Sequence, residues 1–103
     1  MDEIFHMETI YGASKNVEYK KQVLQKCTAI FLFFKSNGLI KFDPLDSDGI
    51  VKKDLVVLAD DLTAAGLVVW KEAFAKWSKA RDKDNNYQNM KMFEVALQKA
   101  KEN

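Results

Sequence analysis

Hydrophobic residues recur at helical spacing along most of this chain. The clearest stripe predicts a helix over residues 17–36, because its apolar side chains follow one another at intervals of three, four and seven. Asn16 is suited to cap the start of this helix, and Asn37-Gly38 is suited to end it. The side chains that we expect to face the core are Val17, Val23, Leu24, Cys27, Ile30, Phe31 and Phe34.

Three further segments have the same periodicity. Thr63 is a good N-cap for a second long helix that runs to about Arg81, and a last helix follows the polar run 82–86. A short first helix is predicted from Ile4 to Gly12. The apolar positions of the second long helix are Leu67, Trp70, Phe74 and Trp77, and those of the last are Met90, Phe93, Leu97 and Ala100.

The middle of the chain, residues 39–61, is ambiguous. Asp43-Pro44 has the form of an N-cap followed by proline at the first helical position, and Gly49 limits such a helix to one or two turns. Beyond it, Val51, Leu55, Leu58 and Leu62 lie at helical spacing. The run 55–58 is also rich in β-branched residues, which suit a short buried strand. We favour a helix here.

These elements predict a mainly α protein, a compact single-domain helical bundle that spans residues 1–103. The alternative is an α+β fold with a short two-stranded ribbon, similar to a winged-helix domain. The chain has 103 residues, of which 48% are hydrophobic. That is enough for one core without a disulfide or a metal ion.

The charge distribution indicates a protein partner rather than nucleic acid. The net charge is only +1, whereas proteins that bind phosphates are usually basic. Residues 42–61, however, carry six aspartates against two lysines. An acidic patch of this kind attracts a basic partner. The candidate partner-binding residues are Asp43, Asp46, Asp48, Asp60 and Asp61, and the surface near Tyr11 or Tyr87 is the alternative.

No set of residues indicates catalysis, a cofactor or a metal site. His6 and Cys27 are the only histidine and cysteine, which excludes sites built from several such ligands. Cys27 lies on the apolar stripe and is expected to be a buried hydrophobe. Two acids near the amino terminus argue against an export signal, and the longest apolar run, 28–34, is too short to span a membrane. We therefore expect a cytoplasmic protein that does not enter a membrane.

Residues 55–84 resemble a family of small helical bacterial proteins. The matching residues are the run 60–66, with the pattern Asp-Leu-Thr-x-x-Gly, then Lys76-Trp77 and the run 81–83. Proteins with this pattern are similar to the immunity proteins of contact-dependent growth-inhibition systems. The resemblance implies a stoichiometric inhibitor that binds the toxin domain of its own system. It carries over no specific toxin-contacting residue.

A winged-helix module is the main competing interpretation. Leu62-Thr63-x-x-Gly66 also resembles the segment where winged-helix domains return from the wing, which would imply DNA binding or regulation. That interpretation makes 55–58 a strand and needs a basic recognition helix before it, where the chain is instead acidic. An accessory interaction protein and an enzyme are two further interpretations. A toxin inhibitor accounts best for the acidic segment, and the toxin is expected to be a nuclease with a basic active site.

Overall fold

The computed structural model describes residues 3–12 and 16–102 and is mainly helical, as the sequence predicted. A two-stranded antiparallel sheet is also present, so the ribbon of the α+β alternative exists as well. None of the described helices is long and apolar enough to cross a membrane. The elements in chain order are β1 (Glu3–His6), α1 (Met7–Gly12), α2 (Val17–Ser36), β2 (Val56–Leu58), the 3-10 helix η1 (Ala59–Asp61), α3 (Ala64–Asp84) and α4 (Lys91–Glu102).

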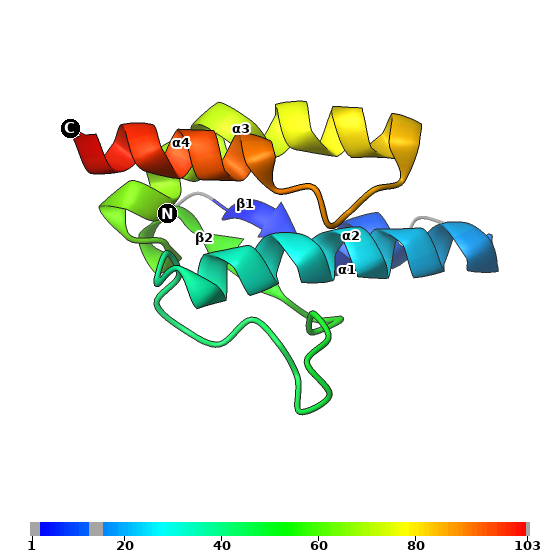
Figure 1. The fold of residues 1–103 in the computed structure, drawn as a ribbon. Helices are drawn as coiled ribbons and strands as arrows, with labels where there is room; N and C mark the ends of the chain where they lie inside the picture. The colour runs from blue at the N-terminus through cyan, green and yellow to red at the C-terminus, as the bar shows by residue number, and fades with distance from the viewer. Residues whose placement is uncertain (1–2, 13–15, 103) are drawn as a thin grey trace.

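Two helical layers enclose the core. Helices α3 and α4 pack against each other and form one layer, and α2 forms the other (Figure 1). The long connection from α2 to β2 extends from the side of α2 that faces away from α3 and α4 (Figure 1). An aromatic cluster joins these layers, because rings from all three helices and from β1 are in contact. Its buried members are Phe5, Phe31, Phe34, Trp70, Trp77 and Phe93.

The predicted caps of the two long helices are confirmed. The Asn16 side chain accepts hydrogen bonds from the amides of Glu18 and Tyr19, and the Thr63 hydroxyl accepts one from the Gly66 amide. Gly38 has a φ of +65°, which is the left-handed conformation expected just after a helix. Helix α3 continues past Arg81 to Asp84, and Asn85 ends it in the left-handed region.

The helix favoured for residues 50–59 is wrong, because this segment contains strand β2. Val57 pairs with Phe5 of β1 in antiparallel register, and both side chains are buried. The neighbours of Val57 along β2 are half-buried, so burial alternates with a period of two. The partner strand lies about fifty residues earlier in the chain. The local spacing of Leu55 and Leu58 therefore carries no information about this pairing.

Two predictions near the amino terminus are corrected in part. The first helix begins at Met7 rather than Ile4, because residues 3–6 form β1 instead. Phe5 thereby contacts Phe31, with their ring centroids 4.9 Å apart. Val17 does not belong to the buried stripe of α2, since it is 69% exposed. It lies in the first turn of that helix, beyond the reach of the core.

No helix begins at Asp43-Pro44. The Asp43 carboxylate accepts a hydrogen bond from the Leu45 amide, two residues ahead, and so closes a turn. The Lys52 amide donates to the Pro44 carbonyl, and Leu45 and Val51 form an antiparallel bridge. Residues 43–54 thus contain no helix in the described structure, and the recognition helix that a winged-helix interpretation requires is missing from this segment.

Candidate partner-binding surface

Residues 42–50, which we call the acidic loop, are anchored on α2. The Val51 amide donates a hydrogen bond of 3.0 Å to the Thr28 hydroxyl. Pro44, Leu45 and Val51 are buried, and the pairing of Leu45 with Val51 closes the base of the loop. An apolar base and one bond to a helix therefore anchor an otherwise exposed segment.

The Asp46 carboxylate organises the tip of the acidic loop. Its Oδ1 atom accepts hydrogen bonds from the amides of Asp48, at 2.9 Å, and Ile50, at 3.1 Å. Gly49 has a φ of +77°, in the left-handed region that favours glycine. The tip is therefore preorganised, and Asp46 has a structural role besides its charge.

Asp43 lies at the start of the same loop and is also hydrogen-bonded. The Leu45 amide and then the Lys35 ammonium, 3.1 Å from Oδ2, hold the pKa of the Asp43 carboxyl below its usual value. Both partners favour the charged form. Asp43 thus stays ionised, but Lys35 already offsets part of its charge.

Asp60 and Asp61 lie outside the loop, in η1. The half-buried Asp61 accepts a hydrogen bond of 2.8 Å from the Leu58 amide, so it caps this short helix. The Lys41 amide donates to the Asp61 carbonyl, which places η1 next to the chain that leads into the acidic loop. Asp60 is exposed.

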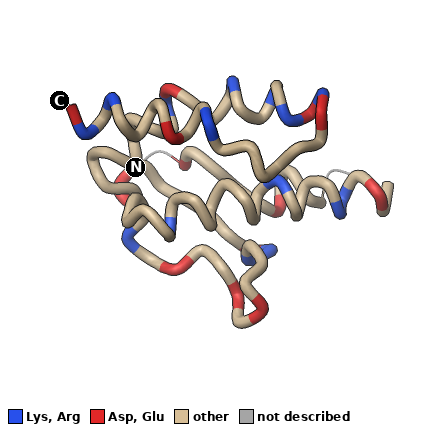
Figure 2. Tube along the Cα trace, viewed as in Figure 1, with Lys and Arg blue, Asp and Glu red and all other residues tan. Residues whose placement is uncertain are grey.

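The five predicted aspartates therefore fall into two groups. The carboxylates of Asp43, Asp46 and Asp61 accept backbone hydrogen bonds. Those of Asp48 and Asp60 belong to exposed residues and form no hydrogen bond or ion pair within the described parts of the chain. Along the connection from α2 to β2, basic residues lie on either side of the acidic loop (Figure 2). The acidic surface is consequently smaller than the sequence count indicates.

A groove beside the acidic loop was not predicted from the sequence. It has a volume of about 780 Å³ and runs along α2 between the tip of the loop and the connection from α3 to α4. Leu32 and Ile50 line it and are 49% and 42% exposed. One feature of the sequence could have indicated it: Leu32 is a large apolar residue that falls outside the predicted buried stripe of α2. The other lining residues are Lys21, Leu24, Gln25, Thr28, Ala29, Asn85, Asn86, Tyr87 and Gln88.

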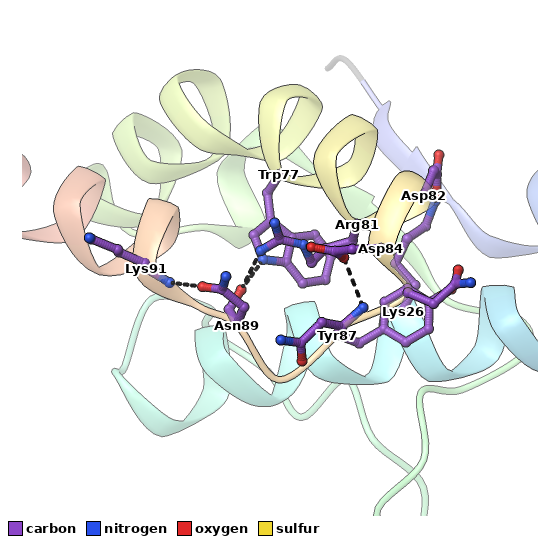
Figure 3. Close-up of polar contacts among 10 residues, drawn as sticks. Lys26, Trp77, Arg81, Asp82, Asp84, Tyr87, Asn89 and Lys91 are labelled. Carbon is purple, nitrogen blue, oxygen red and sulfur yellow. Dashed lines mark hydrogen bonds and ion pairs between the residues drawn. The ribbon is translucent and has the colours of Figure 1, made fainter.

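Buried side chains of α3 hold the second wall of this groove (Figure 3). The Trp77 indole donates a hydrogen bond of 2.6 Å to the Asn89 carbonyl, and Arg81 donates to the same oxygen at 3.2 Å. Arg81 also pairs with Asp84, whose carboxylate accepts a bond from the Asn86 amide. The connection 85–90 is thereby fixed to α3 rather than left as a free loop.

Tyr87, named from sequence as an alternative contact, faces the groove from this wall. Its hydroxyl is 3.2 Å from Oδ1 of Asn85 and donates a hydrogen bond to it. Partial burial raises the pKa of the Tyr87 phenol, so the group is neutral at physiological pH. Tyr11 lies at a different place, with its ring near the ammonium groups of Lys20 and Lys53.

The described residues include no group of three or more His, Cys, Asp or Glu side chains placed to hold a metal ion. The Cys27 side chain is buried, and burial raises the pKa of its thiol to about 11. A thiol of this kind is a poor nucleophile at neutral pH.

We expect Cys27 to react slowly with an aromatic disulfide reagent near pH 8 until the protein is unfolded. With a pKa of about 11, only about 0.1% of the thiol is ionised at that pH, and the side chain is shielded from the reagent as well. The release of the coloured thiolate, followed with and without urea, measures both rates. Immediate stoichiometric labelling of the folded protein would contradict the burial of Cys27.

Comparisons with protein-family models, curated proteins and solved structures find no match for this chain.

Proposed function

We propose that this chain is an immunity-type inhibitor that binds a basic toxin domain through the acidic loop and blocks its active-site surface. The observation that carries the proposal is the preorganised tip of that loop. Asp46 orders the tip, the Asp48 carboxylate has no partner in the described structure, and Ile50 is 42% exposed beside it. An exposed charge next to an exposed apolar residue on a fixed backbone suits a protein interface.

Electrostatics favour a basic partner. Enzymes that cut nucleic acids bind phosphates and therefore present cationic clefts. Unpaired carboxylates on a nearly neutral protein accelerate association with such a cleft and disfavour acidic competitors. The resemblance of residues 55–84 to immunity proteins supports the same role. Such an inhibitor would meet its toxin in the cytoplasm.

The proposal is tested with the toxin domain that the neighbouring gene would encode, at the variable carboxyl end of a large secreted protein. We expect co-expression of this chain to restore the growth of cells that produce the toxin domain. The purified proteins should form a complex of defined stoichiometry. Failure to protect the cells, together with failure to form a complex, would reject the proposal.

Neutralising two unpaired carboxylates should slow association without disturbing the fold. We expect Asp48→Asn with Asp60→Asn to lower the association rate constant about threefold to tenfold at low salt, with a weaker dependence on salt. Both side chains are exposed and cap nothing in the described structure, so stability should change little. Stopped-flow mixing with the toxin domain over a range of salt concentrations measures the effect.

The matched control changes the net charge by the same amount elsewhere. Glu72→Gln with Glu94→Gln removes two exposed carboxylates from α3 and α4. If the effect belongs to the acidic loop and η1, the control should retain most of the original rate and salt dependence. Equal effects from the two double variants would mean that only the net charge matters and that the partner binds elsewhere.

A further inference from the structure

We propose that the groove along α2 receives an amphipathic helix of the partner, with its apolar face on α2 and its basic face toward the acidic loop. This inference rests on the proposed function and adds the surface and the kind of segment that binds it. The groove and the loop are continuous, because Ile50 lines the groove and belongs to the tip that Asp46 organises.

The floor of the groove has the form that a second helix requires. Leu24, Thr28 and Leu32 are spaced by four residues, so they form one ridge along the surface of α2. An amphipathic helix buries its apolar stripe by placing it beside such a ridge. Leu32 is the principal anchor point for such a helix. Its side chain is 49% exposed, so a partner can bury apolar surface there.

Both walls of the groove are held before any partner binds. The bond from Val51 to Thr28 and the bonds to Asp46 fix the loop side. The bonds from Trp77 and Arg81 to the Asn89 carbonyl fix the opposite side (Figure 3). A binding surface that is already ordered loses little conformational entropy when a ligand binds. The groove is thus suited to binding without rearrangement.

Charge selects the occupant. Lys21 is the only charged residue in the described lining, and the remainder is apolar, hydroxyl or amide. The Asp46 carboxylate accepts a hydrogen bond of 3.1 Å from the amide of Ile50, which lines the groove, so this negative charge lies at the loop side of the groove. A helix with leucine-like anchors, and with lysines or arginines on the side toward Asp46, matches the apolar floor and the acidic edge. Lys21 lies seven residues before Thr28 on α2, about two helical turns from the point where the loop is anchored. The aspartates of the acidic loop would repel an acidic helix.

The test uses a synthetic amphipathic peptide made only of leucine and lysine. Two matched peptides accompany it: one has glutamate in place of lysine, and the other has the same composition in an order that is not amphipathic. We expect the first peptide to bind at least about tenfold more tightly than either of the others. Amide chemical-shift changes in the labelled protein should centre on Leu32, Ile50 and Tyr87.

Variants of the groove then test the assignment. Leu32→Asn with Ile50→Asn should weaken binding of the leucine–lysine peptide by about tenfold or more, because both apolar anchor points are lost. The control, Met92→Asn with Val95→Asn, changes two residues on α4 of similar exposure, 40% and 48%. Unfolding curves should show that both variants are folded. Equal weakening by the two variants, or shift changes centred on another surface, would overturn the inference.

Other occupants give different results. If a second copy of this chain fills the groove, sedimentation will show a dimer that the Leu32→Asn and Ile50→Asn changes abolish, and the inference is then wrong. Its failure can also be separated from that of the proposed function. A toxin domain that binds the groove variant as tightly as the original protein would overturn the groove and leave the inhibitor function intact. Absence of any toxin complex would reject the proposed function. The peptide experiments would still show whether the groove binds a basic amphipathic helix.

Discussion

Replacing Trp77 by alanine is expected to lower the free energy of unfolding by about 3–5 kcal/mol, the largest loss we anticipate from a single substitution. Trp77 is fully buried, and its ring centroid lies 5.2 Å from that of Phe93 on α4. The indole also donates to the Asn89 carbonyl. The substitution therefore leaves a cavity between α3 and α4 and removes a bond to the segment that joins them. Urea unfolding followed by far-UV circular dichroism measures the loss.

Two further variants separate the causes of this effect. Trp77→Phe keeps most of the apolar contact but removes the hydrogen bond, and Arg81 still donates to the Asn89 carbonyl. We expect its loss to be clearly smaller than that of the alanine variant, about 1–2 kcal/mol. Val68→Ala is the control on the same helix, because Val68 is exposed, and it should change stability by less than about 0.5 kcal/mol. A Trp77→Ala variant as stable as the control would refute the packing described.

Gly66→Ala should destabilise the protein by about 1–3 kcal/mol, although alanine is normally favoured in a helix. Gly66 lies in the first turn of α3, and a Cβ atom there would overlap the Leu39 carbonyl oxygen. That oxygen also accepts the hydrogen bond of the Thr63 amide, so the backbone of residue 39 cannot move aside without losing it. Thermal unfolding should show a midpoint lower by about 4–8 °C for each kcal/mol.

Gly12→Ala is the matched control for this prediction. Gly12 also belongs to a helix, α1, but among the described residues no atom lies within 4 Å of the position that its Cβ would occupy. The same chemical change should therefore cause no loss of stability, and it should lower the entropy of the unfolded chain slightly. Similar losses at both positions would mean that the close approach of Gly66 to Leu39 is not the cause.

The contact at Gly66 also gives a physical meaning to the motif that carries the family resemblance. Leu62 is buried, Thr63 caps α3, and Gly66 allows the backbone of residue 39 to approach the helix. Each residue of this part of the motif thus helps to position the start of α3 beside the end of α2. These positions serve the fold, and the proposed interface lies on other residues.

The parts of the fold that the sequence predicted correctly depend on local interactions. The caps Asn16 and Thr63 bond to amides within three residues, so their geometry is present in a short stretch of chain. The core stripes of α2 and α3 follow from the helical period alone, and most of the predicted positions are buried or half-buried. A mainly α fold therefore follows from local patterns.

The sequence was less informative where the outcome depends on distant partners. Strand β2 exists because Val57 pairs with Phe5, and a helical spacing of leucines in the same segment cannot reveal that contact. Asp43 was expected to cap a helix, but its actual partners are the Leu45 amide and the Lys35 ammonium. A short, ambiguous segment adopts the conformation that its long-range contacts stabilise most.

For the candidate surface too, some features follow from the sequence and others only from the tertiary structure. The acidic composition of residues 42–61 can be read directly from the chain, because charge is a property of the residue type. Which carboxylates are available to a partner was decided by the tertiary structure. Those of Asp46 and Asp61 accept backbone hydrogen bonds, whereas that of Asp48 forms none with any residue that the structure describes. The groove arises only where α2, the acidic loop and residues 85–88 meet. Its lining comes from three segments far apart in the chain, and no local pattern encodes their proximity.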